Sequence, residues 1–252
     1  MKIIISPAKK MREDLDSLAW RDLPRFLPQA RELLELMGRM SYTQLRELWK
    51  CSDDIAALNV RRLEEMDLDG RLTPALLSYE GIQYRYMAPG VFTREQWDYV
   101  QEHLRILSGF YGLLRPFDGV TPYRLEMQAK LQTYKGKNLY EYWGDRIAKA
   151  LTEEDACILN LASKEYSLSV SRYLPASVRF VTCVFGEQRE GRVVEKGTMC
   201  KMARGEMVRF LAERGIEQPE AVREFDRLDY AFDRERSSKD LFVFLRRRAG
   251  RE

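Results

Sequence analysis

Short apolar runs alternate with stretches of helical periodicity along the chain, and this alternation predicts an α/β or α+β fold. Runs rich in β-branched and aromatic residues predict strands. These runs are Lys2–Ile5, Ala156–Leu161, Val178–Phe185, Arg192–Glu195, Tyr230–Phe232 and Leu241–Leu245. Apolar residues spaced three and four apart predict helices. The predicted helices are Gln29–Met40, the segment after Ser41, Asp53–Met66, Ala75–Tyr79, Arg94–Leu107, Asn138–Leu151, Thr198–Arg214 and Gln218–Arg227.

The order of these elements predicts helices packed around a central mixed sheet, because the strands are few and widely separated. No internal repeat and no change of composition marks a linker, so we expect one compact domain over residues 1–252. Ser41, Ser52 and Thr93 are expected to cap the helices that follow them. Gly81–Ala88 fits neither period, and the basic tail RRRAGRE is expected to fray.

The periodic pattern breaks in Ser108–Met127 (SGFYGLLRPFDGVTPYRLEM). The helical period of Arg94–Leu107 ends at a Gly-hydrophobic-x-Gly turn, and two prolines then disfavour helix in the residues before them. A helix, such a turn and a second short element resemble a helix-hairpin-helix, whose turn donates backbone N–H groups to DNA phosphates. The turn at Gly109–Gly112 is one residue longer than a strict Gly-x-Gly turn, and the stretch also suits a connection that knits the core together.

Composition describes an ordinary globular protein, with 45% hydrophobic and 32% charged residues. No apolar run approaches the roughly 18–20 residues of a membrane span. The N-terminus, MKIIISPAKK, has too short an apolar run for a signal peptide and lacks its cleavage pattern. We therefore expect a cytoplasmic protein without membrane contact.

Cysteine and histidine usage narrows the chemistry. The four cysteines stand far apart without a CxxC pair, which argues against a zinc ribbon and against a disulfide framework. Cys200 has lysine neighbours and is a candidate for a reactive thiol, although a buried structural role is the commoner one. His103 is the single histidine, which excludes His-rich metal sites, and any Ser-His-Asp triad would need it. We expect no metal and no cofactor.

Charge is spread unevenly along the chain. The net charge is +3, and Leu104–Lys137 holds six basic residues against two acidic ones. Nine of the thirteen tyrosines lie between Tyr79 and Tyr142, so the aromatic and basic concentrations overlap. That overlap suits phosphate contact with base stacking, and it equally suits an aromatic core under a solvated surface.

Polar residues follow two predicted strands. Ser6 and Lys9 come directly after the first strand, and Asn160, Ser163 and Glu165 follow the second. If the strands are parallel neighbours, these residues share the sheet edge at which α/β proteins bind ligands. Ser6 and Lys9 would then suit an anion, whereas Asn160 and Ser163 could instead cap the following helix.

A third cluster falls on the helix predicted at Thr198–Arg214. Lys201 and Arg204 are three residues apart and so face the same side of that helix. Gly205 lets another backbone or a ligand come close, and close packing is the more common reason for such a glycine.

Four blocks together resemble one known family. They are ISPAK at Ile5–Lys9, LRILSGFYGLLRPFD…PYRLEM at Leu104–Met127, NLAS-x-EY at Asn160–Tyr166 and K-x-ARG-x-M at Lys201–Met207. Over nearly its full length the chain is similar to the YaaA family of bacterial peroxide-stress proteins. Two blocks depart from the family pattern: Gly81–Pro89 lacks an expected Gly-Leu pair, and Asp229 stands where glycine is usual.

The resemblance implies a cytosolic protein that keeps unincorporated iron low under hydrogen-peroxide stress and so limits oxidative DNA damage. It also implies one α/β domain with a positively charged cleft, a helix-hairpin-helix-like element and binding of double-stranded DNA. No established reaction comes with the family, so catalytic residues stay unknown. The residues that match its motifs are Ser6, Lys9, Tyr111, Arg115, Asp118, Tyr123, Arg124, Glu126, Asn160, Ser163, Glu165, Tyr166, Lys201, Arg204 and Gly205.

Three functions remain open at this point. A protein that binds double-stranded DNA without sequence preference would place Arg115, Arg124, Lys201 and Arg204 in one basic groove. The alternative is an enzyme acting on a nucleotide, nucleoside or other phosphate-bearing small molecule, because acidic motif residues would repel DNA. Direct iron sequestration has little support with one histidine, and we expect any effect on iron to be indirect.

Overall fold

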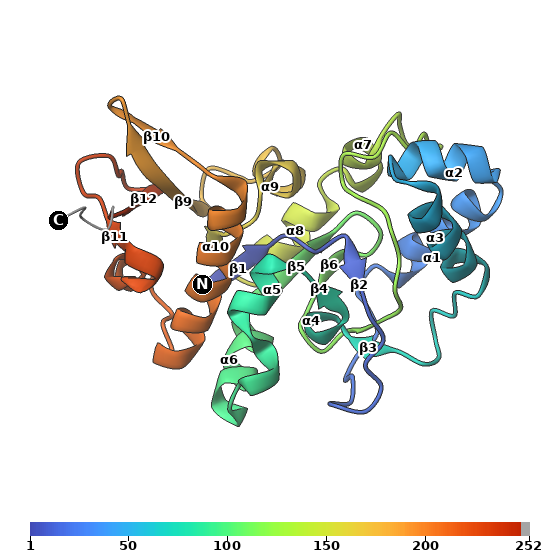
Figure 1. Ribbon diagram of the computed structural model, residues 1–252, viewed down its shortest axis with the longest axis horizontal. Coiled ribbons are helices and arrows are strands. Elements are labelled where there is room, and N and C mark those ends of the chain that lie inside the picture. Colours follow the sequence, from blue (N-terminus) through green and yellow to red (C-terminus); the bar gives the residue numbers. More distant parts are fainter. Residues whose placement is uncertain (248–252) are drawn as a thin grey trace.

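A central β-sheet organises the computed structural model, which describes residues 1–247 (Figure 1). The last five residues of the basic tail lie outside that range. Within it the sheet has eight strands in the order β11-β12-β9-β8-β1-β5-β6, with β10 paired to β9. The strands are β1 (Lys2–Ile5), β5 (Leu104–Ser108), β6 (Gly112–Leu114), β8 (Cys157–Asn160), β9 (Arg179–Arg189), β10 (Arg192–Val194), β11 (Tyr230–Phe232) and β12 (Leu241–Arg246).

The sheet is mixed, as predicted. Its central strands β12, β9, β8, β1 and β5 pair in parallel, while β6, β10 and β11 pair antiparallel to their neighbours. Ile3 of β1 stands opposite Leu104 of β5 and Leu159 of β8. Every residue of β1 and β5 is buried, because a parallel sheet is covered on both faces and its strands are therefore continuously apolar.

Helices surround this sheet. They are α1 (Leu27–Gly38), α2 (Tyr42–Trp49), α3 (Asp53–Glu64), α4 (Ala75–Ser78), α5 (Ile82–Met87), α6 (Arg94–His103), α7 (Leu139–Trp143), α8 (Arg146–Thr152), α9 (Lys164–Ser171) and α10 (Gly197–Arg214). Short 3₁₀ turns occur at Pro89–Val91, Pro219–Glu224 and Arg227–Asp229. Two small antiparallel pairs complete the fold: β2 (Lys10–Met11) with β4 (Tyr79–Glu80), and β3 (Thr73–Pro74) with β7 (Gly119–Val120).

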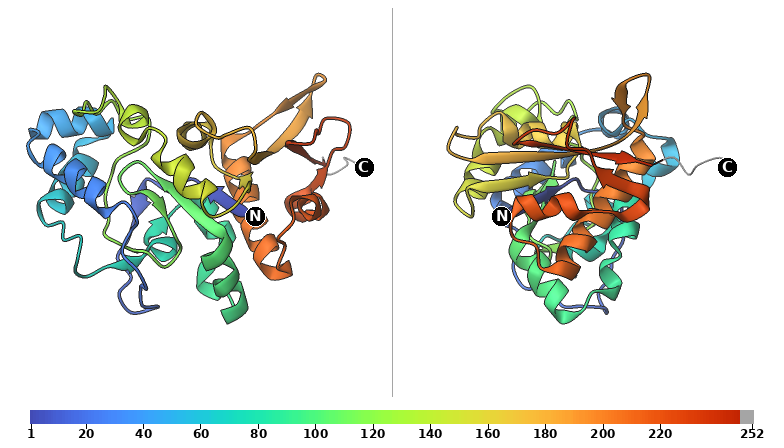
Figure 2. Two further views of the ribbon diagram at one scale, coloured as in Figure 1. Left: turned by 180° about the vertical axis from the view of Figure 1, so that it is seen from behind. Right: turned by 90° about the vertical axis from the view of Figure 1, so that its left-hand side faces the viewer.

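The elements divide along the longest axis of the molecule. Helices α1 to α3 lie at one end, and β10 to β12 lie at the other (Figure 1). Helix α10 packs on α5, α6 and β9, and α9 packs on α7, α8 and β5. The view from behind shows the same order, with the N-terminus near the middle (Figure 2, left).

Local capping signals in the sequence were reliable. Ser41 and Thr93 each form a capping box. The hydroxyl of the N-cap residue accepts a hydrogen bond from the backbone N–H of a glutamine three residues later, and the side chain of that glutamine accepts one from the backbone N–H of the N-cap residue. Ser52 takes the cap position without a side-chain bond. The helix predicted at Asn138–Leu151 is wrong as one element, because Gly144, at φ +52°, separates α7 from α8.

The predicted helix-hairpin-helix is not what residues 94–114 form, all of which the structure describes. Helix α6 ends at His103, and β5 begins at the next residue. The turn at Gly109–Gly112 joins β5 to β6 as a β-hairpin. Helical periodicity failed here because pairing with β1 buries Leu104–Ser108 on both faces, and tertiary context overrides a local pattern.

Gly205 explains how α10 approaches α5. A Cβ atom at this position would lie 2.1 Å from the carbonyl oxygen of Gln83 and 2.9 Å from the backbone nitrogen of Met87. The two helix backbones are therefore in direct contact, and glycine is required for packing at this point.

Gly205→Ala should lower the melting temperature, because the added methyl must force α5 away from α10. Overpacking of this kind costs about 1–3 kcal/mol, more than the gain of about 1 kcal/mol in helix propensity. Gly38→Ala is the matched control in α1, since a Cβ atom added there would meet no atom within 4 Å. Thermal unfolding followed by circular dichroism decides the matter, and a Gly205→Ala protein as stable as Gly38→Ala would contradict the packing account.

Candidate functional site

Two serines meet at the carboxyl edge of the parallel strands. Strands β1 and β8 pair in parallel, so the residues that follow them lie side by side, as the sequence predicts. The backbone N–H of Ser163 donates to Ser6 Oγ at 2.9 Å, and the two hydroxyl oxygens are 3.2 Å apart. This contact joins the first residue after β1 to the N-cap of α9.

A cleft of about 550 Å³ opens at this edge. We call it the cleft throughout. Segment 6–10, helix α5 and helices α9 and α10 supply its walls. The predicted site residues that line it are Ser6, Lys9, Glu126, Ser163, Glu165, Tyr166, Lys201 and Arg204.

Glu126 is a nearly buried carboxylate within this cleft. Its Oε1 lies 3.1 Å from Lys9 Nζ and 3.2 Å from Arg124 Nη2. The backbone before it runs against Gly109, where a Cβ atom would sit 2.4 Å from the carbonyl oxygen of Leu125. Two cations offset the desolvation of the buried charge, so Glu126 is held in place rather than free to move.

Glu165 is a second carboxylate, in the first turn of α9. Its Oε1 accepts from the backbone N–H of Gln128 at 3.2 Å. Burial raises the pKa of Glu165, and the nearby Glu126 adds to that rise. The cleft therefore contains a carboxyl group that holds its proton more readily than an exposed glutamate.

The opposite wall carries cations and donors without acceptors. Lys201 and Arg204 project from α10, and Gln83 comes from α5. Among the described residues, the buried side-chain atoms without a hydrogen-bond partner include the donors Gln83 Nε2 and Arg204 Nε on this wall, and Arg124 Nε and the acceptor Glu126 Oε1 at the ion pair. Buried donors are normally satisfied, so Gln83 and Arg204 are available to donate to a water molecule or to a ligand in the cleft.

Tyr111 and Tyr123 belong to the aromatic core beneath the cleft. The Tyr123 hydroxyl lies 2.6 Å from Ser108 Oγ and 2.8 Å from the Tyr79 hydroxyl. Burial raises the pKa of Tyr123 to about 12, so it stays neutral. The Tyr111 hydroxyl accepts from the backbone N–H of Thr121. Both rings support the wall through packing and hydrogen bonds inside the protein.

Asn160 also acts inside the protein. Its Oδ1 accepts from the backbone N–H of Ala162 at 2.9 Å, and its Nδ2 donates to Thr182 Oγ1 at 3.4 Å. The side chain is buried and shapes the turn that carries Ser163 to the cleft.

Arg115 and Asp118 lie at the other edge of the sheet. Strand β6 runs antiparallel to β5 and carries the chain back toward the amino ends of the parallel strands. There Arg115 and Asp118 line a separate cavity of about 340 Å³ with Arg105 and Glu154. Glu154 binds Arg105 at 2.7 Å and Arg115 at 3.5 Å. The structure thus brings Lys201 and Arg204 together at the cleft but leaves Arg115 apart from them.

Other candidates from the sequence are structural. Cys200 Sγ donates to the carbonyl oxygen of Phe185 at 3.1 Å, and burial raises the pKa of its thiol to about 11. His103 Nδ1 lies 3.0 Å from the carbonyl oxygen of Met1. Within residues 1–247 no group of three or more His, Cys, Asp or Glu side chains could hold a metal ion.

Sequence reasoning missed the contribution of α5. Gln83 and Tyr84 line the cleft, and the Tyr84 hydroxyl donates to the carbonyl oxygen of Ser6 at 3.0 Å. These residues fall in the segment whose periodicity was ambiguous. Its two closely spaced tyrosines and glutamine were the only available signal.

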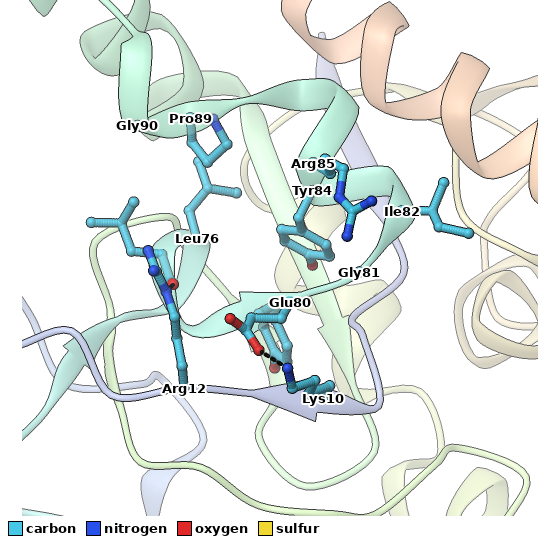
Figure 3. Close-up of a pocket in the computed structure, with 12 residues that line it drawn as sticks. Lys10, Arg12, Leu76, Glu80, Gly81, Ile82, Tyr84, Arg85, Pro89 and Gly90 are labelled. Atoms are coloured by element: carbon cyan, nitrogen blue, oxygen red, sulfur yellow. Dashed lines mark hydrogen bonds and ion pairs between the residues drawn. The ribbon is translucent and has the colours of Figure 1, made fainter.

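A second hollow of about 410 Å³ (Figure 3) shares several lining residues with the cleft. We call it the outer hollow. Lys10, Arg12, Glu80 and Arg85 line it together with apolar residues from α4 and the Pro89–Val91 turn.

Fold and site together define a class: an α/β protein whose polar cleft lies at the carboxyl edge of its parallel strands. A family model described as "Peroxide stress protein YaaA" matches residues 1–236. A "UPF0246 protein" of Desulfitobacterium hafniense is 55% identical over 246 residues, covering 98% of each chain. Relatives with the same description from Agathobacter rectalis and Pediococcus pentosaceus are 53% and 49% identical.

The chain therefore belongs to the peroxide stress protein YaaA family. The family resemblance expected from the four sequence blocks is confirmed. In the part of the chain that the structure describes, no helix is both long and apolar enough to span a membrane.

Asp118→Asn should flatten the pH dependence of stability. Burial raises the pKa of Asp118 to about 7. The carboxyl of an unfolded chain titrates near 4, so between these values only the folded state keeps the proton. The free energy of unfolding then falls as pH rises through this interval, by up to about 1.4 kcal/mol per pH unit.

Asparagine keeps an acceptor for the backbone N–H of Arg115, which now donates to Asp118 Oδ2 at 2.8 Å. The variant should therefore match the wild type near pH 4 and become progressively more stable relative to it toward pH 7. Urea unfolding at several pH values measures this difference, with Asp98→Asn on the exposed face of α6 as the control. Parallel curves for wild type and Asp118→Asn would contradict a raised pKa.

Proposed function

We propose that the cleft binds a phosphate-bearing small molecule, such as a nucleotide or nucleoside phosphate, and that the protein is an enzyme acting on it. One observation carries this proposal: Lys9, Lys201 and Arg204 line a concave cavity of about 550 Å³ that also holds three carboxylates, of Glu80, Glu126 and Glu165. Cavities of about 300–1,000 Å³ suit small ligands, and clustered cations suit phosphate.

The carboxylates favour a small molecule over a polynucleotide backbone. Glu126 and Glu165 lie in the same cleft as the cations, where they would repel a continuous row of phosphates. A small ligand can place its phosphate on Lys201 and Arg204 and turn a polar group toward the glutamates. The buried, unpartnered donors of Gln83 and Arg204 support this arrangement, because phosphate or carbonyl oxygens would satisfy them.

Glu165 is the residue we assign to proton transfer. A carboxyl with a raised pKa is suited to general acid or base work near neutral pH. Glu126, fixed between Lys9 and Arg124, would orient the ligand and maintain the charge that acts on Glu165.

Binding of double-stranded DNA is the second candidate. Lys9, Lys10 and Arg12 follow β1 in sequence and are exposed, and Arg85 is exposed on α5 across the same face. Such a row of cations suits backbone contact without base readout. On this account the acids in the cleft would lie beneath the nucleic acid and face away from it.

Either activity would serve the peroxide stress response after which the family is described. We propose that any effect on free iron is indirect. The carboxylates of the cleft have Lys9, Arg124, Lys201 and Arg204 as neighbours, and this positive surrounding opposes binding of Fe²⁺.

Lys201→Ala should weaken binding of adenosine 5′-monophosphate at least about tenfold, because it removes a cation from the cleft. Isothermal titration calorimetry measures the dissociation constant. Lys239→Ala, an exposed lysine away from the cleft, is the matched control and should bind as the wild type does. Equal affinity in the wild type and Lys201→Ala would contradict phosphate binding in the cleft.

The same variants separate the two candidates when a 20-base-pair duplex replaces the nucleotide. Strong duplex binding that falls steeply with salt and weakens in Lys201→Ala, with no nucleotide binding, would favour the DNA function. Nucleotide binding with weak, Lys201-independent duplex binding would favour the small-molecule function.

Glu165→Gln should abolish turnover while leaving nucleotide affinity within about twofold, because the amide keeps the shape but cannot transfer a proton. Phosphorus NMR of a nucleotide panel incubated with each protein follows the reaction. Turnover that persists unchanged in Glu165→Gln would remove this residue from the mechanism.

A further inference from the structure

The cleft and the outer hollow are continuous. Both are lined by Lys10, Glu80, Gly81, Ile82 and Tyr84. Gly81 stands at the passage between them, and a Cβ atom there would meet the Cβ of Ala8 at 3.1 Å. A side chain at this position would crowd Ala8 and take up space that the two hollows share.

One ion pair is shared by the cleft and the outer hollow. Lys10 Nζ lies 2.8 Å from Glu80 Oε2, and both residues belong to the small β2–β4 pair (Figure 3). The two side chains are 79% and 34% exposed. Solvated ion pairs contribute little to stability, so an anion that competes for Lys10 can open this one at small cost.

The outer hollow has more cations than it has acids. Lys10, Arg12 and Arg85 face it against the single acid Glu80 (Figure 3). Arg12 is positioned by its own contacts, since its Nε donates to the carbonyl oxygen of Leu77 at 3.3 Å and its Nη2 lies 3.0 Å from Asp14. Arg85 forms no ion pair with any described residue. An anion in the outer hollow would therefore meet two guanidinium groups: that of Arg12, which is already paired with Asp14, and that of Arg85, which has no ion-pair partner among the described residues.

We propose that the outer hollow is a second anion subsite of the cleft, so that the ligand carries two separated anionic groups. The first group lies on Lys201 and Arg204, and the second lies on Arg85 with Lys10 and Arg12. This inference rests on the proposed small-molecule function and narrows the ligand to bis-anionic compounds such as bisphosphates. Joining two anions on one molecule makes the second contact intramolecular, which raises affinity only when the spacing matches.

The test uses α,ω-alkanediol bisphosphates with two to eight methylenes, each compared with the alkyl monophosphate of equal length. Calorimetry should show one optimal length at which the bisphosphate binds at least about tenfold tighter than its monophosphate. Arg85→Ala should abolish that advantage and leave monophosphate binding unchanged. Lys201→Ala should weaken both ligands, and Arg61→Ala, an exposed arginine on α3, should change neither.

The outcomes separate this inference from the proposed function. If monophosphates bind and depend on Lys201, but no bisphosphate gains affinity or the gain survives Arg85→Ala, the second subsite is overturned and the cleft function stands. If neither series binds at millimolar concentration, both are overturned. A length-dependent gain that requires Arg85 supports the subsite.

Discussion

Parallel pairing of β1 with both β5 and β8 is the constraint on which the rest of the structure depends. Because the three strands run in the same direction, their carboxyl ends lie at one edge of the sheet. Ser6, Gly109 and Ser163 follow these strand ends and lie at that edge. The hydrogen bond between Ser163 and Ser6 ties two of these segments, and the close approach of Leu125 to Gly109 adds the third. Residues more than a hundred positions apart in the sequence thus form one cleft.

The balance of charge in the cleft narrows what it can hold. Glu126 neutralises part of the positive charge of Lys9 and Arg124. Among residues 1–247, the acidic partner of Arg204 is the more distant Glu195, at 3.6 Å. The positive charge left for a ligand is therefore concentrated on the α10 side, next to buried donors without acceptors. A site with anions on one side and donors on the other orients a polar ligand, whereas a uniformly basic groove would only attract it.

Much of the fold could be predicted from the sequence, because buried parallel strands and capped helices leave local patterns. Lys2–Ile5 and the caps at Ser41 and Thr93 are examples. The meeting of Ser6 with Ser163 also followed, since it needed only one assumption about strand neighbours. The predictions that failed depended on long-range strand pairing. The segment Leu104–Ser108 has a helical pattern but forms β5, because it pairs with β1. Strand β6 runs antiparallel to β5, which places Arg115 and Asp118 at the opposite edge of the sheet from the cleft. Gln83 could not be recognised from the sequence, because what marks it is a buried amide nitrogen without a hydrogen-bond acceptor, and only the structure shows this.

The contact at Gly205 has a consequence for motion. Because the backbones of α5 and α10 touch there, Gln83, Tyr84 and Arg85 are carried on the same rigid unit as Lys201 and Arg204. The close backbone contact at Gly205 leaves little room for these two walls to shift relative to each other. The adjustable parts are the long side chains of Lys9 and Lys10, which are mostly exposed and form solvated ion pairs with Glu126 and Glu80. Ligand capture would then consist of side chains folding inward onto a fixed frame, a motion of nanoseconds and not of whole domains.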